Sequence, residues 1–444
     1  MARAHWASRF GFVMVTAGSA VGLGNIWKFP YITGKYGGSA FVLMYLLAIA
    51  LTGIPVFLAE LYIGRTSQRN PVQAFEQLAG RRTPWSAVGW LGLIAGFLIL
   101  CFYSVVGGWV LHYLWESIQG TFHGFDPEQT KQHLGALMAN PGKMIFWHAL
   151  FMVATVGILL GGVSAGIERC NKIMMPGLIL ILLALLVRSA FLPGFGAALD
   201  FLLKPNFAGL SAEGLLQAMG HSFFTLSLGI GAIITYGSYT KKDQPLVPVA
   251  LTVVALDTVI ALIAGVVTLA AVFSYGGQPE AGPTLMFQTL PNLFAQMPGG
   301  YWVSVAFFVL VAFAALTSSI SMLEPVIAYW VDRKKGSRTG IALGSGFLAF
   351  AIGCVCALSF NKLENWKIGK HIFFDFLDKL TSNLCLPLGG LLIIVFYGWV
   401  LGKPAVKATM GGKNRFWTQV LLWCARWITP IAVLAVLING LRQW

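Results

Sequence analysis

Stretches of apolar residues, each long enough to cross a lipid bilayer as a helix, recur from one end of this chain to the other. A bilayer core of about 30 Å is crossed by a helix of roughly 20 residues. Hydrophobic residues make up 57% of the 444 residues and charged residues 10%, whereas an ordinary soluble domain carries about 25% charged residues. We therefore expect an all-α integral membrane protein, with no part of the chain left over for a soluble domain.

The apolar stretches predict eleven membrane-spanning helices. The first stretch could instead be a secretory signal peptide, since Ala17–Ala20 is rich in small residues. We favour a membrane span, because glycines interrupt this stretch and Asn25 and Lys28 follow it. The expected spans cover residues 9–34, 39–64, 86–118, 143–161, 168–190, 212–239, 245–274, 300–331, 340–358, 370–400 and 415–440.

The distribution of charge predicts the orientation in the membrane. The formal net charge of +14 could suggest a partner such as nucleic acid, but the basic residues lie in short clusters between the spans, and we expect no nucleic-acid partner. Because basic loops favour the cytoplasmic side, the N-terminus is expected in the cytoplasm and the tail Arg442–Trp444 outside. The expected cytoplasmic loops are those that carry Arg65, Arg69, Arg81 and Arg82; Lys241 and Lys242; Arg333, Lys334, Lys335 and Arg338; and Lys403, Lys407, Lys413 and Arg415.

Two spans contain clusters of glycine and hydroxyl residues that weaken a helix, Gly18–Asn25 in the first and Thr225–Gly231 in the sixth. Unwound backbone at membrane depth is tolerated only where protein or a wet cavity buries it. A break exposes carbonyl groups that hold cations and N–H groups that favour anions. The alternative is that each cluster only lets helices pack closely.

The two interrupted spans stand five helices apart, at the same place in two successive five-helix units. Because five is odd, the second unit would be inserted upside down relative to the first, and paired breaks in such halves indicate a transporter's central site. We expect inverted five-helix repeats over residues 1–190 and 212–400, with broken first and sixth helices, and an additional eleventh helix over residues 415–440.

Three ionisable residues lie inside the apolar spans, where a lone charge is costly and indicates function. For Asp257 either a bound cation or a protonated, hydrogen-bonded carboxyl would compensate. Glu60 is expected to cap unwound backbone, and His221 precedes the break in the sixth span. The hydroxyls of Ala314–Ser319 could be ligands for a hard cation such as sodium, or could bond back to carbonyls of their own helix.

Two segments between spans also carry expectations. Gly120–Lys143 is predicted to be a polar loop. Gln278–Gly300 contains the interrupted apolar run PTLMFQTLPNLFAQMPGG, which is too short to cross the membrane. We interpret that run as a re-entrant or lid-like helical hairpin, and the alternative is a plain loop whose apolar residues need covering.

Three segments resemble the neurotransmitter:sodium symporter family: Trp6–Tyr31, Ser222–Tyr239 and Ala315–Pro325. The likeness covers nearly the whole chain, and the GxGN-x-x-x-FP core of the first span and the FFxLSLGxG run of the sixth carry it. A member of this family is the standard example of transporters with discontinuous helices, so that this geometry is implied by the resemblance.

The resemblance implies binding sites for two sodium ions, the expected cofactors. Ala261 stands where some relatives have a polar residue that helps recruit chloride, and the fixed carboxylate of Asp257 supplies the counter-charge, so that no chloride is expected. The first site would use the Ala20 carbonyl, Asn25, Thr225 and Asp257, completed by the substrate carboxylate. The second would use the Gly18, Val21 and Ala314 carbonyls with Thr317 and Ser318.

The same resemblance implies a substrate site for a small amino acid. Relatives that carry monoamines have an aspartate where this chain has Gly22, and an amino acid brings its own carboxylate, so that Gly22 favours amino acids. The apolar side-chain pocket favours a neutral hydrophobic or aromatic one. The implied substrate residues are Ala20, Gly22, Leu23, Gly24, Ile99, Tyr103, Phe224, Ser227, Ile230, Ser318 and Met322.

Two gates are also implied. Lys28, where many relatives have arginine, would meet Asp378 on the outside, and lysine lacks the bidentate fork of arginine. Inside, Arg3 would pair with Asp332 beside Trp6, Ser238 and Tyr239. The alternative for the four charged residues is the solvated rim of a helix end.

The chain is expected to act by alternating access as a sodium-coupled symporter that takes up an L-amino acid, with no catalytic residues. Many relatives have twelve helices, whereas eleven are expected here, as in shorter bacterial members. The short outer loop also lacks a cysteine pair and an N-x-S/T acceptor, unlike the animal transporters. Both features suggest a multi-pass protein of a prokaryotic inner membrane. The expected state is a monomer or weak homodimer in the lipid bilayer. The alternatives are a non-cycling amino acid sensor, a channel or a membrane enzyme. The sequence shows no metal-ligand cluster that would support the enzyme.

Overall fold

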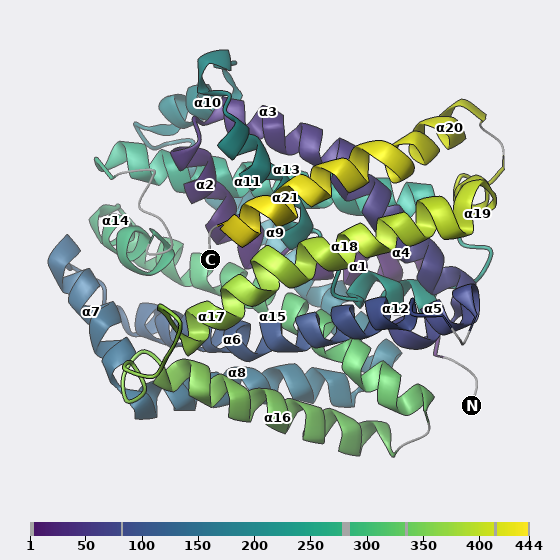
Figure 1. Cartoon of the computed structure of the whole chain (residues 1–444). Coiled ribbons are helices and arrows are strands. Elements are labelled where there is room, and N and C mark those ends of the chain that lie inside the picture. Colours follow the sequence, from purple (N-terminus) through teal and green to yellow (C-terminus); the bar gives the residue numbers. More distant parts are fainter. Residues whose placement is uncertain (1–3, 81–82, 278–284, 334–335, 413–414, 443–444) are drawn as a thin grey trace.

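The computed structural model describes residues 4–80, 83–277, 285–333, 336–412 and 415–442, and is almost wholly helical (Figure 1). The expected spans are formed by α-helical and π-helical segments. These are α1 (Arg9–Ala20), η1 (Gly24–Lys28) and α2 (Phe29–Lys35); α3 (Ser39–Ala48), η2 (Ile49–Gly53) and α4 (Ile54–Ser67); α6 (Ser86–Gln119); α8 (Pro141–Leu160); η3 (Gly162–Glu168) and α9 (Arg169–Ser189); α11 (Ala212–Thr225) and α12 (Ala232–Ser238); α13 (Leu246–Ser274); α15 (Gly300–Asp332); α16 (Arg338–Leu358); α17 (Phe373–Lys379), η7 (Leu380–Cys385), α18 (Leu386–Val395), η8 (Phe396–Leu401) and α19 (Gly402–Thr409); and α20 (Arg415–Trp423), η9 (Cys424–Ile428) and α21 (Thr429–Arg442).

Within the described residues, nine helices are long and apolar enough to cross a membrane, and α1 with α2, bent by 50° at their break, make a tenth. The sixth predicted span is missing from that number because α11 has 14 residues and α12 has 7, each too short alone. Counted as one broken span, they complete the eleven that the sequence predicts. The expected all-α fold with broken first and sixth helices is confirmed, apart from one small antiparallel pairing of β1 (Lys367–Ile368) with β2 (His371–Ile372).

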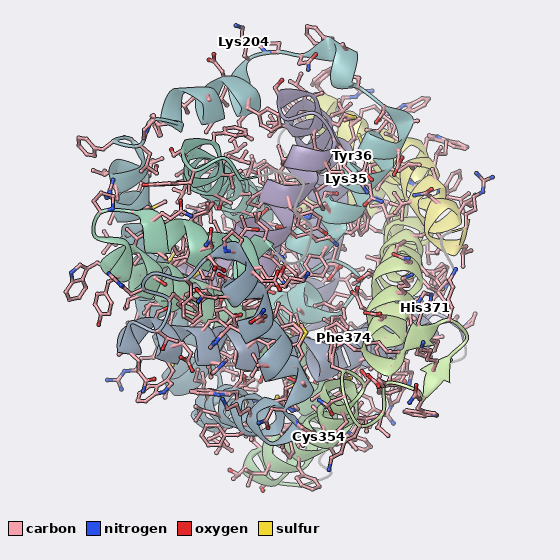
Figure 2. All side chains as sticks on the ribbon, turned by 90° about the vertical axis from the view of Figure 1, so that its left-hand side faces the viewer. Lys35, Tyr36, Lys204, Cys354, His371 and Phe374 are labelled. Carbon is pink, nitrogen blue, oxygen red and sulfur yellow. The ribbon has the colours of Figure 1, made fainter. Side chains whose placement is uncertain are left out.

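Shorter helices lie at the two ends of the molecule. The N-terminus lies at the same end as α5 (Pro71–Ala79), α12, α19 and α20 (Figure 1). At the opposite end lie α7 (Pro127–Ala139), α10 (Phe195–Leu203), α14 (Leu290–Gln296) and the described C-terminus. Figure 2 looks onto this second end, where Lys204 points outward at the rim. Two further short turns are η4 (Phe207–Gly209) and η6 (Leu285–Thr289).

Two predictions need correction, and a third lies partly outside the described residues. The tenth span was expected to end at residue 400, but a further helical segment, α19, follows η8 and extends to Thr409. Gly402 at this junction adopts a positive φ of 61° that re-directs the chain. The predicted polar loop over Gly120–Lys143 contains α7, which starts from a capping box in which Asp126 and Gln129 each bond the other's backbone N–H. Within the run expected as a hairpin, residues 278–284 lie outside the described residues, and η6 and α14 follow with their apolar residues buried.

Burial separates a central group of helices from a lipid-facing shell. Nine of the twelve residues of α1 are buried, and α6, α13 and α15 are also largely buried. In contrast, only 33% of the most apolar window is buried in each of α8, α9 and α16, and large apolar side chains such as Val153, Leu180 and Phe347 are exposed on them. An apolar surface of this kind suits lipid, and the central helices hold the polar residues.

Candidate functional site

The first span is interrupted between Ala20 and Gly24. The α-helix ends there because Val21 adopts an extended conformation with φ −73° and ψ 102°. The Asn25 side chain then stabilises the unwound backbone, since its Oδ1 accepts a hydrogen bond from the Gly22 N–H at 3.0 Å. The glycines that predicted the break therefore mark its place, and Asn25 holds its shape.

The sixth span is interrupted between Thr225 and Ala232. Ser227, Gly229 and Gly231 adopt positive φ values of 52°, 82° and 74°. A non-glycine residue with positive φ is uncommon and points to a functional constraint. Ser227 is held by a contact with the first break, because its Oγ donates a hydrogen bond to the Ser19 carbonyl at 2.6 Å. The two predicted breaks therefore lie side by side and are joined directly.

Glu60 of α4 binds the break in the sixth span. The Gly229 N–H donates a hydrogen bond to its Oε1 at 2.7 Å, and Glu60 is fully buried. Buried backbone N–H groups need a partner, and no neighbouring turn supplies one to Gly229. The expectation that Glu60 caps unwound backbone is confirmed by this contact.

Three residues predicted for the first sodium site meet beneath the breaks. Asp257 Oδ1 accepts hydrogen bonds from Asn25 Nδ2 at 2.7 Å and from Thr225 Oγ1 at 2.9 Å. Sequence reasoning missed Tyr45, whose hydroxyl donates to Asp257 Oδ2 at 3.3 Å. Donors at both carboxylate oxygens suit the ionised form, and carboxylate, amide and hydroxyl oxygens are the ligands that hard cations take.

A small cavity lies against both breaks. Every residue that the resemblance implies for the substrate lines this cavity. Ser19, Thr225 and Leu386 also line it. Leu386 is the first residue of α18 in the tenth span, and it belongs to no motif that could have identified it. The cavity is lined by Ser19, Ala20, Gly22, Leu23, Gly24, Ile99, Tyr103, Phe224, Thr225, Ser227, Ile230, Ser318, Met322 and Leu386.

Two hydroxyl groups at the Gly22 side of this cavity are buried without a hydrogen-bond partner among the described residues, those of Tyr103 and Ser318. A Cβ atom added to Gly22 would lie 2.5 Å from Ser318 Oγ and 3.7 Å from the Tyr103 hydroxyl. The site therefore has two polar groups ready for a ligand and no room for a side chain at position 22. Buried polar groups left unpaired cost free energy, which a polar ligand would recover.

The residues predicted for the second sodium site lie where α1 packs on α15. A Cβ atom on Gly18 would lie 3.2 Å from Thr317 Cβ. The Thr317 hydroxyl donates to the Phe313 and Ala314 carbonyls at 3.0 and 3.1 Å, which is the bonding to its own helix that the sequence left open. Val21, also predicted for this site, donates its N–H to Ala17 at 2.7 Å.

Sequence reasoning missed Asn171 of α9, which adjoins this second set. Its Nδ2 donates to the Ile167 carbonyl at 2.9 Å, but its Oδ1 is buried without a partner within the described part of the chain. That oxygen lies against Gly18, because it would be the nearest atom to a Cβ added to this glycine. No signal in the sequence singles it out, because Asn171 lies among the charged residues Glu168, Arg169 and Lys172.

The two residues predicted for the outer gate form no direct ion pair in this structure. Within the described residues, no ion pair joins Lys28 and Asp378. Lys28 Nζ lies over the Phe224 ring, 4.5 Å from its centroid, and Asp378 Oδ1 accepts from Ser382 Oγ at 3.0 Å. A lysine has no planar fork to fix a carboxylate, and an aromatic face binds its ammonium group instead.

The inner gate residues lie together at the opposite end of the broken helices, except that Arg3 lies outside the described residues. Trp6 is buried and donates its backbone N–H to the Tyr239 carbonyl at 3.1 Å. Ser238 Oγ donates to the Thr235 carbonyl at 2.5 Å. Asp332 Oδ2 accepts from the backbone and side chain of Asn70 at 3.0 and 2.9 Å.

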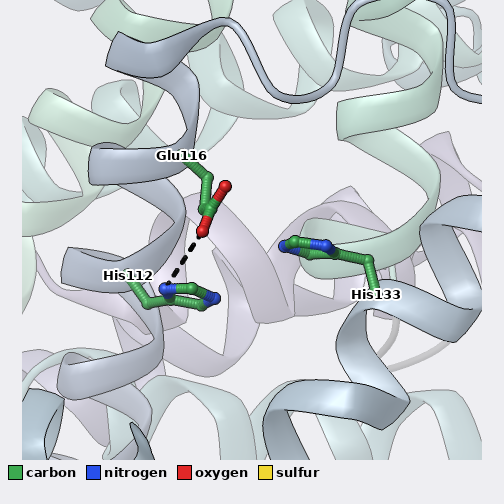
Figure 3. A group of neighbouring side chains, drawn as sticks. All are labelled: His112, Glu116 and His133. Carbon is green, nitrogen blue, oxygen red and sulfur yellow. Dashed lines mark ion pairs between the residues drawn. The ribbon is translucent and has the colours of Figure 1, made fainter.

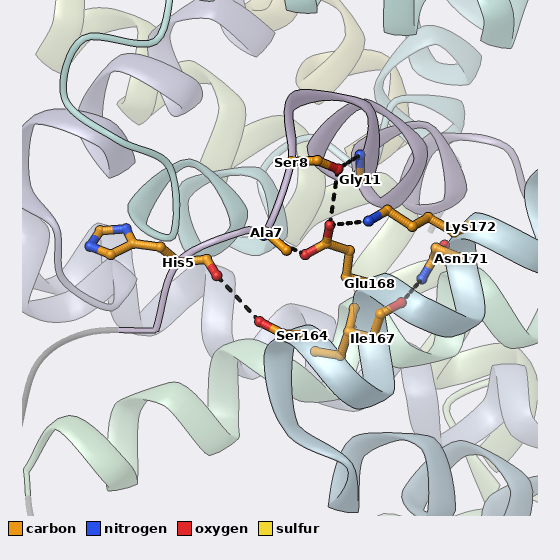
Figure 4. Close-up of polar contacts among 9 residues, drawn as sticks. All are labelled: His5, Ala7, Ser8, Gly11, Ser164, Ile167, Glu168, Asn171 and Lys172. Carbon is orange, nitrogen blue, oxygen red and sulfur yellow. Dashed lines mark hydrogen bonds and ion pairs between the residues drawn. The ribbon is translucent and has the colours of Figure 1, made fainter.

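Two further carboxylates close this end, and sequence reasoning missed both. Glu168 accepts the Ala7 N–H at 2.7 Å and Lys172 Nζ at 2.6 Å, and thereby ties the N-terminal segment to α9 (Figure 4). Glu324 accepts the Tyr239 hydroxyl at 2.7 Å and pairs with Arg338 at 2.5 Å. Each carboxylate is nearly fully buried. The apolar stretch around Glu324 was an available signal, whereas Glu168 is followed by Arg169 and Lys172 and carried none.

Comparison with known proteins places these features in one family. The model of the Sodium:neurotransmitter symporter family matches residues 3–132 and 125–444. The chain is similar to the uncharacterized sodium-dependent transporter YhdH of Bacillus subtilis, with 39% identity over 439 residues that cover 98% of this chain and 97% of the relative. It is also similar to the sodium- and chloride-dependent GABA transporter 2 of Homo sapiens, with 25% identity over 504 residues that cover 100% of this chain and 80% of the relative.

The fold matches a solved transporter over its full length. The crystal structure of MhsT in complex with L-phenylalanine has a TM-score of 0.91 and 43% sequence identity, and the match covers 99% of this chain and 100% of that chain.

Proposed function

The chain belongs to the sodium:neurotransmitter symporter family and is a sodium-dependent, multi-pass membrane transporter rather than an enzyme, and on that premise we propose that it takes up a neutral hydrophobic or aromatic L-amino acid by alternating access. The observation that carries this proposal is the cavity at the two joined breaks, which combines polar groups at the Gly22 side with apolar side chains such as Ile99, Ile230 and Met322. An amino acid has the same division between a charged backbone and an apolar side chain.

The polar side of the cavity fits the charged part of an amino acid. The carboxylate would accept hydrogen bonds from the Tyr103 hydroxyl and from backbone N–H groups of the first break. The dipole at the start of a helix also favours an anion. Gly22 leaves no side chain to balance an amine that lacks its own carboxylate, and this supports amino acids over monoamines.

The apolar side of the cavity fits a large apolar side chain. It is lined by an aromatic ring, branched aliphatic groups and a thioether, which adapts its shape to a ligand. MhsT, with a fold this similar, was solved in complex with L-phenylalanine, and this supports an aromatic substrate here. The residues proposed for this side are Ile99, Phe224, Ile230, Met322 and Leu386.

We assign two sodium ions to the polar groups next to the cavity. The first would lie at Asp257, Asn25, Thr225 and the Ala20 carbonyl, with the substrate carboxylate as a further ligand. A carboxylate near a sodium ion supplies the negative charge that chloride would otherwise bring, and Ala261, which is buried close by on α13, offers no polar side chain to an anion. Uptake is therefore proposed to be independent of chloride.

The second ion would lie between α1 and α15, at Gly18, Val21, Ala314, Thr317 and Ser318. In this position it would join the first broken helix to a helix that is continuous. Such an ion favours conformations in which these helices are close, and a ligand shifts an equilibrium only through such a difference in affinity. We propose that it couples sodium binding to closure.

In the transport cycle, the inner contacts of Trp6 with Tyr239 and of Glu168 with Ala7 would break when the site opens inward. We propose that the protein lies in a prokaryotic inner membrane with the N-terminus in the cytoplasm, because the basic loops lie at the end that carries α5, α12 and α19. The end that carries α7, α10 and α14 would then be external.

The test is uptake of radiolabelled amino acids into proteoliposomes that contain the purified protein. An inward sodium gradient should drive accumulation of one hydrophobic or aromatic amino acid, equally in chloride and in gluconate, and a potassium gradient should not. Binding without accumulation would instead support a non-cycling sensor. Accumulation that requires chloride would overturn the proposed role of Asp257.

A further inference from the structure

Three residues with metal-binding side chains meet away from the substrate cavity, at the end of the molecule that carries α7. His112 and Glu116 stand one helical turn apart near the end of α6, and His133 lies on α7 (Figure 3). Figure 3 shows the three side chains directed toward one another across the gap between the two helices. His133 follows Glu116 by seventeen residues, a separation without a recognisable metal-ligand spacing, so that sequence reasoning did not find this group.

The geometry of this group suits a shared ion. One potential ligand atom from each residue lies within 4.8 Å of the other two. His112 Nδ1 and Glu116 Oε1 are 3.8 Å apart, and the centroids of the two imidazole rings are 5.7 Å apart. Ligands about 2.0–2.1 Å from a tetrahedral zinc ion lie roughly 3.3 Å from one another. Small rotations of three side chains would therefore bring the atoms to coordination distance.

The histidines have no other polar partner that explains their placement. Among the described residues, His112 Nδ1 and His133 Nε2 are buried and accept or donate no hydrogen bond, and the 3.8 Å contact with Glu116 is too long to be one. The rings around them are those of Tyr113, Phe122, Phe125 and Trp147. An unpaired polar atom in such surroundings costs free energy, which a bound cation would recover for both histidines.

We propose that His112, Glu116 and His133 form a binding site for a divalent transition-metal ion, with zinc as the best fit. Two imidazoles and one carboxylate are a ligand set that zinc takes, with water in the fourth position, whereas calcium and magnesium prefer oxygen alone. The Glu116 side chain is 15% exposed, which leaves an entry for the ion. The site is separate from the sodium sites and needs no substrate.

A metal at this site would join α6 to α7 and thereby brace the external end. Helix α6 carries Ile99 and Tyr103 of the substrate cavity. Next to the metal site, Tyr113 packs on Phe287 of η6, with ring centroids 5.0 Å apart, and Phe287 also contacts Trp109 at 5.7 Å. The segment η6 would lie at the mouth of the transport path. A bound metal would therefore slow transport, and this consequence alone depends on the proposed function.

Metal binding is tested first on the purified full-length protein without substrate or sodium. Zinc is titrated against a chromophoric chelator, and cobalt is used as a probe because a tetrahedral site gives it intense visible absorption. We expect one ion per chain and at least a tenfold weaker affinity in His133→Ala and in Glu116→Gln. His123→Ala, which removes an exposed histidine from the same loop, should bind zinc as the unchanged protein does.

The result that would overturn the site is equal zinc affinity in the unchanged protein, His133→Ala and Glu116→Gln. Glu116→Gln keeps the size of the side chain, so that it tests the site even where His133→Ala folds poorly. The consequence for transport is tested with zinc added outside proteoliposomes. Zinc should lower the uptake rate of the unchanged protein several-fold and leave Glu116→Gln unaffected, and equal inhibition of both would refute the bracing role. The cobalt spectrum tests metal binding independently of transport, so that it would stay the same even if amino acid uptake failed.

Discussion

The contact between Glu60 and Gly229 makes the sharpest prediction about how the broken sixth span is held. The Gly229 N–H donates to Glu60 Oε1 at 2.7 Å, and Gly229 lies between two other residues of positive φ. Glu60→Ala removes the acceptor and leaves the N–H buried without a partner, at a cost of about 1–3 kcal/mol. Because this backbone lines the cavity, the cost should fall on the conformation that binds substrate.

The expected effect is a loss of substrate affinity in Glu60→Ala by about 5- to 150-fold, which is the equivalent of that free energy. Glu60→Gln is the matched control, since its amide oxygen can accept the same hydrogen bond, and its affinity should stay much closer to that of the unchanged protein. The assay is sodium-dependent binding of labelled phenylalanine to protein in detergent. Size-exclusion chromatography would show that each variant remains folded.

Wild-type affinity in Glu60→Ala would refute the argument, because the break would then hold its shape without the carboxylate. An equal loss in Glu60→Ala and Glu60→Gln would also contradict it, since the charge of Glu60 and not its hydrogen bond would then matter.

Three further substitutions test separate parts of the account. Asp257→Asn should lower sodium affinity and make uptake higher in chloride than in gluconate. The substitution removes the carboxylate charge beside the sodium ion, and two unit charges about 4 Å apart interact by about 4 kcal/mol at an effective dielectric constant near 20. Equal uptake of the variant in both salts would count against this role of Asp257. Tyr103→Phe should weaken substrate binding at least about tenfold, since a hydrogen bond to a charged group contributes about 1.5–3 kcal/mol, and unchanged affinity in equilibrium binding would remove Tyr103 from the site. Gly64→Ala should lower the melting temperature in detergent, because a Cβ there would collide with the Ile234 carbonyl oxygen and overpacking costs about 1–3 kcal/mol. Gly157→Ala, where nothing lies within 4 Å, is its control.

The broken spans were predictable from the sequence because glycine and hydroxyl residues inside an apolar stretch have a direct physical meaning. The position of Glu60 was predictable for the same reason, since a buried carboxylate needs donors and unwound backbone supplies them. The cavity lining was implied by family resemblance, and the structure places all of those residues around one cavity.

Contacts that depend on tertiary packing were not predictable in this way. Tyr45 and Leu386 reach the site from spans without any motif, and only the packing of those spans brings them near Asp257 and the cavity. Lys28 was placed in an ion pair by analogy with arginine, but its ammonium group lies over Phe224. His133 approaches α6 only because α7 folds back onto it, which a pattern of single residues does not reveal.

Sodium-dependent binding at Asp257 is the most direct test of the central claim. Binding of labelled phenylalanine to the purified protein would be measured in sodium and in potassium, for the unchanged protein, for Asp257→Ala, and for Asp243→Ala, which alters an exposed aspartate outside the site. The account predicts binding in sodium only, lost in Asp257→Ala and retained in Asp243→Ala. Equal binding in potassium, or full sodium-dependent binding in Asp257→Ala, would contradict it.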